Sequence, residues 1–125
     1  MTNDEAVTVY VSIGRNVRAD YEPVSNFYGF TDYLPGQALP DTEWLRFQLD
    51  VEGVLINAGL EVVTRANGSG VYDGVTEDCH FVAAIGAEVD QSKLAQQLSA
   101  TAAMYLQETI AYSVTTTLWA DAEEA

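Results

Sequence analysis

The fold is decided by one strictly alternating stretch near the N-terminus, Val7-Thr8-Val9-Tyr10-Val11-Ser12-Ile13. Successive side chains on a strand point to opposite faces, so the valines and Ile13 share one face while Thr8, Tyr10 and Ser12 share the other. We therefore predict a half-buried strand over residues 7–13. Its apolar face needs a covering layer, and two amphipathic segments later in the chain can supply one.

The first of these segments predicts a helix over residues 41–58. Asp41 is a suitable N-cap, Glu43 lies in the first turn, and Gly59 stands where a left-handed residue ends a helix. Apolar side chains recur at helical spacing along one face: Trp44, Phe47, Val51, Leu55 and Ala58. A second, adjacent stripe consists of Leu45, Leu49 and Ile56, so the helix has either a wide buried face or two separate contacts.

The middle of the chain is rich in β-forming residues. A strand is predicted over residues 60–66, followed by a hairpin turn at Asn67-Gly68-Ser69-Gly70, because asparagine and glycine tolerate positive φ. Extended segments follow over residues 71–75 and 78–85, with Gly74 as a bulge between them. In the later segment one face is shared by Cys79, Phe81, Ala83 and Ile85.

A second helix is predicted over residues 90–107, with Asp90 as its N-cap. Its apolar stripe consists of Leu94, Leu98, Ala102 (or Thr101) and Tyr105. Residues 110–119 alternate again and predict the last strand. The chain, residues 1–125, is expected to form a single domain whose acidic tail, residues 121–125, frays.

The predicted order is β-α-β-β-α-β. Right-handed crossovers would place both helices on one face of a four-stranded antiparallel sheet. This α+β architecture resembles the ferredoxin-like split βαβ arrangement, with residues 15–40 as a long aromatic-rich insertion after the first strand. The helix-free face is expected to show polar and aromatic residues, joined by His80 or Phe81 according to the register: Thr8, Tyr10, Ser12, Ser113, Thr115, Thr117 and Trp119.

Residues 15–40 contain three prolines and no helical period. So long a connection without regular structure is unusual in a compact domain, so we expect either a short hairpin around Tyr28 or a functional loop. The aromatic residues of this segment either pack on their own domain, anchor a protein partner or dimer, or line a small-molecule pocket. They are Tyr21, Phe27, Tyr28, Phe30 and Tyr33.

The chain has 125 residues, with 19 acidic against 5 basic side chains, and a formal net charge of −14. Such a surface argues against direct binding of nucleic acid and against attachment to an anionic membrane. No apolar run approaches the roughly 18 residues of a membrane span, and we expect a cytoplasmic protein without a signal peptide. The single cysteine, Cys79, excludes an internal disulfide and is expected to be a buried strand residue.

Residues able to carry chemistry are few. His80 is the only histidine, and as a general base it would need an orienting partner such as Glu108; the alternative is a hydrogen-bonded structural residue. Weak candidates for a metal site are Asp73, Glu77, Asp78 and His80, although their spacing matches no zinc or EF-hand pattern. The glycines of residues 67–70 lack the lysine of a phosphate-binding loop, so no cofactor is expected.

Two functional hypotheses follow. The leading one is a non-enzymatic interaction protein that binds a basic protein partner and forms a homodimer through the open sheet face. In its sharper form the carboxylates mimic phosphates and inhibit a nucleic-acid-binding protein, a strategy similar to that of small phage-encoded inhibitors; the plain alternative is acidity for solubility or salt adaptation. The other hypothesis is a ligand-binding or enzymatic domain with a pocket between the sheet face and residues 15–40, using His80, Tyr10, Tyr112 and Glu108.

Overall fold

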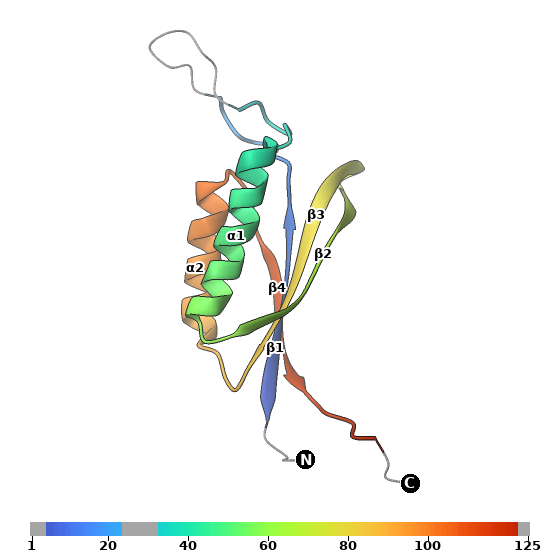
Figure 1. Ribbon diagram of the computed structural model, residues 1–125. Coiled ribbons are helices and arrows are strands. Elements are labelled where there is room, and N and C mark those ends of the chain that lie inside the picture. Colours follow the sequence, from blue (N-terminus) through green and yellow to red (C-terminus); the bar gives the residue numbers. More distant parts are fainter. Residues whose placement is uncertain (1–4, 24–32, 123–125) are drawn as a thin grey trace.

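The computed structural model describes residues 5–23 and 33–122, which form an α+β fold with a four-stranded antiparallel sheet and two helices (Figure 1). The elements are β1 (Ala6–Gly14), α1 (Asp41–Asn57), β2 (Glu61–Tyr72), β3 (Val75–Gly86), α2 (Gln91–Met104) and β4 (Ala111–Thr117). The strands lie in the order β2-β3-β1-β4, so β1 and β3 are central. Phe27, Tyr28, Phe30 and residues 123–125 lie outside the described residues.

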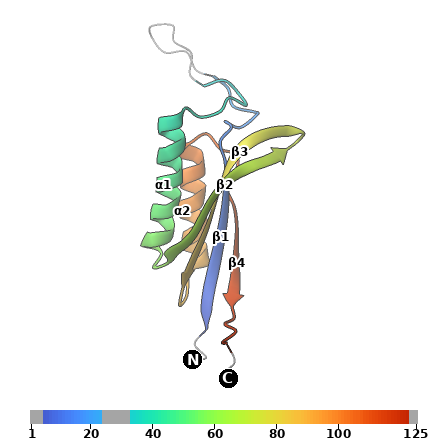
Figure 2. The ribbon, with the colours of Figure 1, turned by 45° about the vertical axis from the view of Figure 1, so that its right-hand side comes forward.

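The two helices lie side by side on the same face of the sheet (Figures 1 and 2). The alternation of β1 places Val9, Val11 and Ile13 under them, fully buried as predicted. The apolar stripes predicted for the helices supply the other layer of the core, with Phe47, Val51, Leu55, Leu94 and Leu98 all buried. The second stripe of α1 does not pack within the described structure, because Leu45, Leu49 and Ile56 are exposed.

The ends of α1 differ in detail from the prediction. Pro40 rather than Asp41 is the N-cap, and no side chain caps the helix. Asp41 is instead the first helical residue, where a carboxylate interacts favourably with the helix dipole. Its side chain forms an ion pair with Arg15. Gly59 follows the C-cap residue Ala58 with φ of 87°, the left-handed conformation that its position predicted.

The predicted hairpin turn at residues 67–70 is wrong. β2 runs on to Tyr72, and the chain reverses at Asp73 and Gly74, which have φ of 49° and 78°. Gly74 therefore belongs to the turn and is not a bulge; the shift in register between β2 and β3 lies instead between Val62 and Thr64. The result is one long hairpin whose turn curls away from the helices (Figure 2).

Residues predicted to form a turn serve other purposes inside β2. The side chain of Asn67 lies opposite His80 and meets its ring. A Cβ atom on Gly70 would lie 2.7 Å from Sγ of Cys79, so the glycine leaves room for that buried side chain. Composition alone cannot separate these uses from a turn, because both favour asparagine and glycine.

The C-terminal half follows the prediction with shifted boundaries. Asp90 caps α2 by accepting a hydrogen bond from the backbone N–H of Lys93, but the helix ends at Met104 and not at residue 107. Leu106 has φ of 58°, which no helix accommodates. β4 then pairs with β1, with Ser113 opposite Tyr10 and Thr115 opposite Thr8.

The described part of the segment between β1 and α1 is held at its base by backbone hydrogen bonds. Asn16 and Ala38 form an antiparallel bridge, and the N–H of Val17 donates to the carbonyl of Gln37 at 2.7 Å. Val17 and Leu39 are buried. The two ends of this connection are therefore fixed to the end of the sheet.

Candidate functional site

Three connections meet at one end of the sheet: the β1–α1 segment, which leads into the start of α1, the β2–β3 turn and the α2–β4 loop (Figure 1). Acidic residues lie on these connections and beside them, and we call this region the acidic end; the ones used below are Asp20, Asp41, Asp73, Glu77, Asp78 and Glu108. Two arginines, Arg15 and Arg18, lie among these acids. The site is therefore assembled from positions that are far apart in the sequence.

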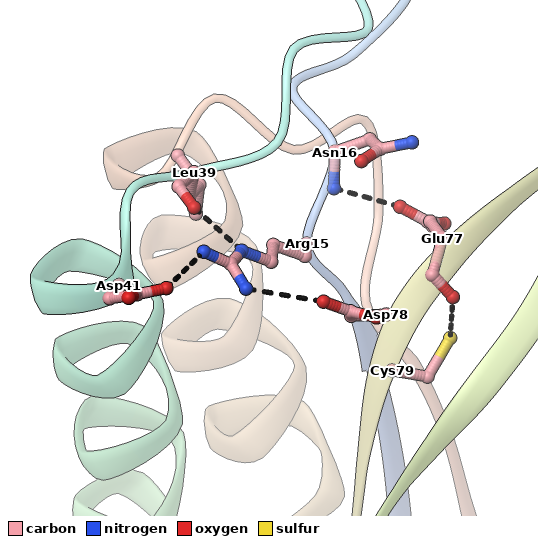
Figure 3. A network of polar contacts seen from close by, with 7 residues as sticks. All are labelled: Arg15, Asn16, Leu39, Asp41, Glu77, Asp78 and Cys79. Atoms are coloured by element: carbon pink, nitrogen blue, oxygen red, sulfur yellow. Dashed lines mark hydrogen bonds and ion pairs between the residues drawn. The ribbon is translucent and has the colours of Figure 1, made fainter.

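Arg15 holds the end of the β1–α1 segment, the first residue of α1 and the strand β3 together (Figure 3). Its Nε donates to the carbonyl of Leu39 at 2.6 Å, Nη2 to Asp41 at 2.7 Å and Nη1 to Asp78 at 3.1 Å. A planar guanidinium has several donors in fixed directions, which suits three acceptors on three elements. Arg15 is thus a structural brace, and its charge is already neutralised by two carboxylates.

Glu77 connects the β2–β3 hairpin to the chain after β1. Its Oε2 accepts a hydrogen bond from the backbone N–H of Asn16 at 2.8 Å (Figure 3). The carboxylate crosses directly over Gly14, where a Cβ atom would lie only 2.4 Å from Oε1. Glycine at position 14 therefore makes this contact possible, which fixes the Glu77 side chain at the edge of the cleft described next.

A cleft with a volume of about 200 Å³ opens at the acidic end, and we call it the end cleft. Three of its lining residues are acidic: Asp73, Glu77 and Glu108. The remaining lining residues are Gly14, Asn16, Val17, Arg18, Ala19, Gly36, Tyr72, Val75, Gln107 and Thr109. Asp73 and Glu108 are exposed, so their carboxylates are available to a molecule that enters.

Arg18 is the cation in the wall of the end cleft, and it is already paired. Its Nε donates to Oδ1 of Asp20 at 2.5 Å and its Nη2 to Oδ2 at 3.0 Å. The hydrogen bond to Asp20 raises the pKa of Arg18, and the same bond lowers the pKa of Asp20. The negative charge of Glu108 raises the pKa of Arg18 further, but the hydrogen bonds of this guanidinium go to Asp20. The carboxylates of Asp73 and Glu108 therefore line the cleft without a hydrogen bond from Arg18. The arrangement suits an ammonium or guanidinium group.

The structure does not bring the four metal candidates together. Asp73 lies in the turn, Glu77 reaches Asn16, Asp78 pairs with Arg15, and His80 is buried beneath α1. Within residues 5–23 and 33–122, no group of three His, Cys, Asp or Glu side chains has an arrangement that could hold a metal ion.

His80 lies on the helix side of the sheet and is only 3% exposed. Its Nδ1 donates to Oδ1 of Asn67 at 2.7 Å, and its Nε2 lies 3.5 Å from Oε2 of Glu52. Glu108, its proposed partner, lines the end cleft instead. The candidate pair is therefore not assembled, and Phe81 rather than His80 faces the open side of the sheet.

The open face of the sheet is hollowed, with a volume of about 670 Å³. Tyr10, Tyr112 and Trp119 line this hollow, whereas none of the described residues between 15 and 40 does so. The full lining consists of Thr8, Tyr10, Val11, Ser12, Val63, Thr64, Ala66, Phe81, Val82, Ala83, Ile85, Ala111, Tyr112, Ser113, Thr117 and Trp119. The end cleft and this hollow share no lining residue. Of the four residues predicted for a pocket between the sheet face and residues 15–40, Glu108 and Tyr112 line a further concavity of about 350 Å³ together with Arg18.

Of the aromatic residues predicted to bind a partner, the structure describes Tyr21 and Tyr33. Both are half-buried and pack against the hydrophobic core. They anchor the segment that forms one wall of the acidic end.

Sequence reasoning missed several contributors to the site. Arg15, Asn16 and Gln107 belong to no recognisable motif. Gly14 comes directly after the strand predicted over residues 7–13, where a glycine is common, so it attracted no attention. One signal was present: Arg15 and Arg18 are two of only five basic residues, and they lie close together in the chain. In a protein with few basic and many acidic side chains, each basic side chain is expected to form ion pairs.

Comparison with known proteins provides no functional assignment. No protein-family model matches the chain, and a search of curated proteins finds no similar sequence. Neither helix of the described residues is long and apolar enough to cross a membrane.

Proposed function

We propose that this chain is a non-enzymatic interaction protein that binds a basic segment of a protein partner at the acidic end. The observation that carries the proposal is the end cleft, in which Asp73, Glu77 and Glu108 surround an opening while Arg18 is bound to Asp20. A lysine or arginine side chain of the partner would enter the cleft, and the exposed acids around it would bind neighbouring positive charges.

The distribution of charge supports this proposal. The formal net charge is −14, and three of the five basic residues, Arg15, Arg18 and Arg65, are engaged in ion pairs with acids. The remaining surface field is dominated by carboxylates. Such a field raises the association rate of a positively charged partner and weakens with added salt.

The sharper form of the proposal concerns the kind of partner. A protein surface that binds nucleic-acid phosphates is rich in lysine and arginine. A rigid domain with carboxylates at one end would compete with phosphates for such a surface and so inhibit it.

The free thiol of Cys79 suits a reducing compartment, which supports a cytoplasmic location.

We also propose that the architecture belongs to the ferredoxin-like split βαβ type, with residues 15–40 as an insertion. Its support is the strand order β2-β3-β1-β4 together with two helices on one sheet face. Because this architecture hosts many unrelated functions, the functional proposal rests on the acidic end alone.

A capture experiment with matched variants tests the function. The tagged protein is incubated at low salt with a lysate of its native host, and bound proteins are eluted with a salt gradient. Asp73→Asn combined with Glu108→Gln removes two exposed charges from the end cleft. Glu61→Gln combined with Glu88→Gln removes two exposed charges at the opposite end of the sheet.

We expect a basic protein to elute from the wild type and from the Glu61/Glu88 variant at similar salt. It should elute from the Asp73/Glu108 variant at clearly lower salt or fail to bind. Equal losses in both double variants would show that only total charge matters, and would contradict binding in the end cleft. Binding that is insensitive to salt would contradict the electrostatic basis itself.

A further inference from the structure

The open face of the sheet carries no charged side chain among the described residues that line its hollow. This is unusual in a chain with a net charge of −14. The face nevertheless presents large aromatic groups, because Tyr10, Phe81 and Trp119 are 51%, 41% and 56% exposed. A contiguous uncharged surface with exposed aromatic residues is more often a site of contact with another molecule than a surface that stays in contact with solvent.

The charge distribution indicates which occupant fits this face. A basic partner is attracted to carboxylates, and none of the described residues that line this hollow carries one. Another copy of the chain is repelled wherever two acidic surfaces meet, and the open face is where such repulsion is least. We propose that a second copy of this chain covers this face, sheet against sheet, with the twofold axis near Tyr10 and Ala83.

The arrangement of large and small side chains on the open face is compatible with a twofold-symmetric contact between two copies. Tyr10 lies on the central strand β1, with Ala83 on one side and Ser113 on the other. Large and small side chains therefore stand next to each other at the centre of the sheet. In a twofold contact each aromatic ring of one copy can occupy the space above the small residues of the other. Threonine and serine hydroxyls nearby would complete the contact with hydrogen bonds.

Sedimentation velocity of the purified protein tests this proposal. We expect a concentration-dependent dimer that becomes tighter as NaCl is raised, because salt screens the repulsion between two acidic copies. This trend is opposite to the one expected for the basic partner, so the two proposals can fail independently. A monomer at every concentration and salt level would overturn the dimer, as would a monomer that retains a small uncharged molecule.

Charge-introducing variants locate the interface. Tyr10→Glu and Ser113→Glu each place a carboxylate at the proposed axis, at exposed positions outside the core. Each should raise the dimer dissociation constant about tenfold or more, which corresponds to about 1.4 kcal/mol. Leu49→Glu adds the same charge to the exposed stripe of α1 and should leave the dimer unchanged. Folded Tyr10→Glu and Ser113→Glu proteins that dimerise like the wild type would overturn the proposal.

Discussion

Glu52 of α1 and His80 of β3 face each other in the interior, with Oε2 of the carboxylate 3.5 Å from Nε2 of the imidazole. Both residues are buried, although both side chains are polar. Arg65 reaches Oε1 of Glu52 with Nη2 at 2.5 Å, and Asn67 accepts a hydrogen bond from Nδ1 of His80. This network lies between α1 and the β2–β3 hairpin, and it joins the two through polar contacts under the helix.

Glu52→Gln should destabilise the protein at neutral pH by about 1–3 kcal/mol, since Arg65 loses the charged acceptor that the buried Glu52 provides. The hydrogen bond from Arg65, reinforced by the nearby His80, lowers the pKa of Glu52 below its ordinary value of 4.5. Its ionised form therefore stabilises the fold above the unfolded pKa, and this contribution is lost as the pH falls through the lower folded pKa. Urea unfolding at several pH values measures the difference between wild type and variant.

That difference should shrink in acid. Glu61→Gln, an exposed acid on β2, serves as the control and should change the stability little at any pH. If the difference in unfolding free energy between wild type and Glu52→Gln stayed constant from neutral pH to well below pH 4.5, the claim that ionised Glu52 stabilises the fold would be refuted.

Tyr105 should titrate abnormally. Burial, with the hydrogen bond to Asp50 as the second cause, raises its pKa from 10.0 to about 12. The neutral phenol is thus favoured by the fold, and this stabilisation is complete below the unfolded pKa and lost as the pH rises toward 12. Ultraviolet titration of the folded protein should show one late tyrosinate step that is missing in Tyr105→Phe. A Tyr105 that ionised together with the exposed tyrosines would disprove this assignment.

Gly70→Ala should destabilise the protein by about 1–3 kcal/mol, because the new Cβ would overlap Sγ of Cys79. Adding Cys79→Ala should restore part of the loss by removing the sulfur. Gly53→Ala is the matched control: nothing lies within 4 Å of its Cβ position, and it is inside α1. It should stabilise the protein by up to about 1 kcal/mol, as helix propensity requires. Thermal unfolding of the wild type, the two single glycine variants and the Gly70→Ala/Cys79→Ala double variant measures these differences. A Gly70→Ala protein as stable as the wild type would be incompatible with the close contact.

Arg15→Lys should loosen the acidic end without unfolding the protein. Lysine retains the charge but cannot reach Leu39, Asp41 and Asp78 at once, so we expect a loss of about 1–2 kcal/mol. Amide hydrogen exchange should rise most at Val17 and Leu39, whose N–H groups close the base of the segment. Exchange that rose equally throughout the sheet would show that Arg15 has no local role.

Local patterns were sufficient for much of the fold. The alternation of residues 7–13 and the stripes of both helices identified the core, because burial acts on each segment through its own periodicity. The hairpin turn was misplaced because Asn67 and Gly70, whose composition is typical of turns, are used inside β2 for contacts with His80 and Cys79. These contacts depend on the register of β2 against β3, which no local pattern specifies.

The candidate site was less accessible to sequence reasoning. Asp73, Glu77 and Glu108 were noted separately, as metal or catalytic candidates, and their convergence on one cleft depends on how three connections meet. The brace formed by Arg15 joins residues up to 63 positions apart in the chain. Such a contact becomes visible only once the strand order is known.

The central claim, that the end cleft binds basic groups, is tested most directly by nuclear magnetic resonance. Isotope-labelled protein is titrated at low salt with a short lysine-rich peptide, and backbone amide shifts are followed residue by residue. We predict that the largest changes cluster at Asn16, Arg18, Asp73 and Glu108, and that they disappear in the Asp73→Asn/Glu108→Gln variant. Changes spread evenly over the acidic surface, with Glu61 and Glu88 affected as strongly, would contradict the account.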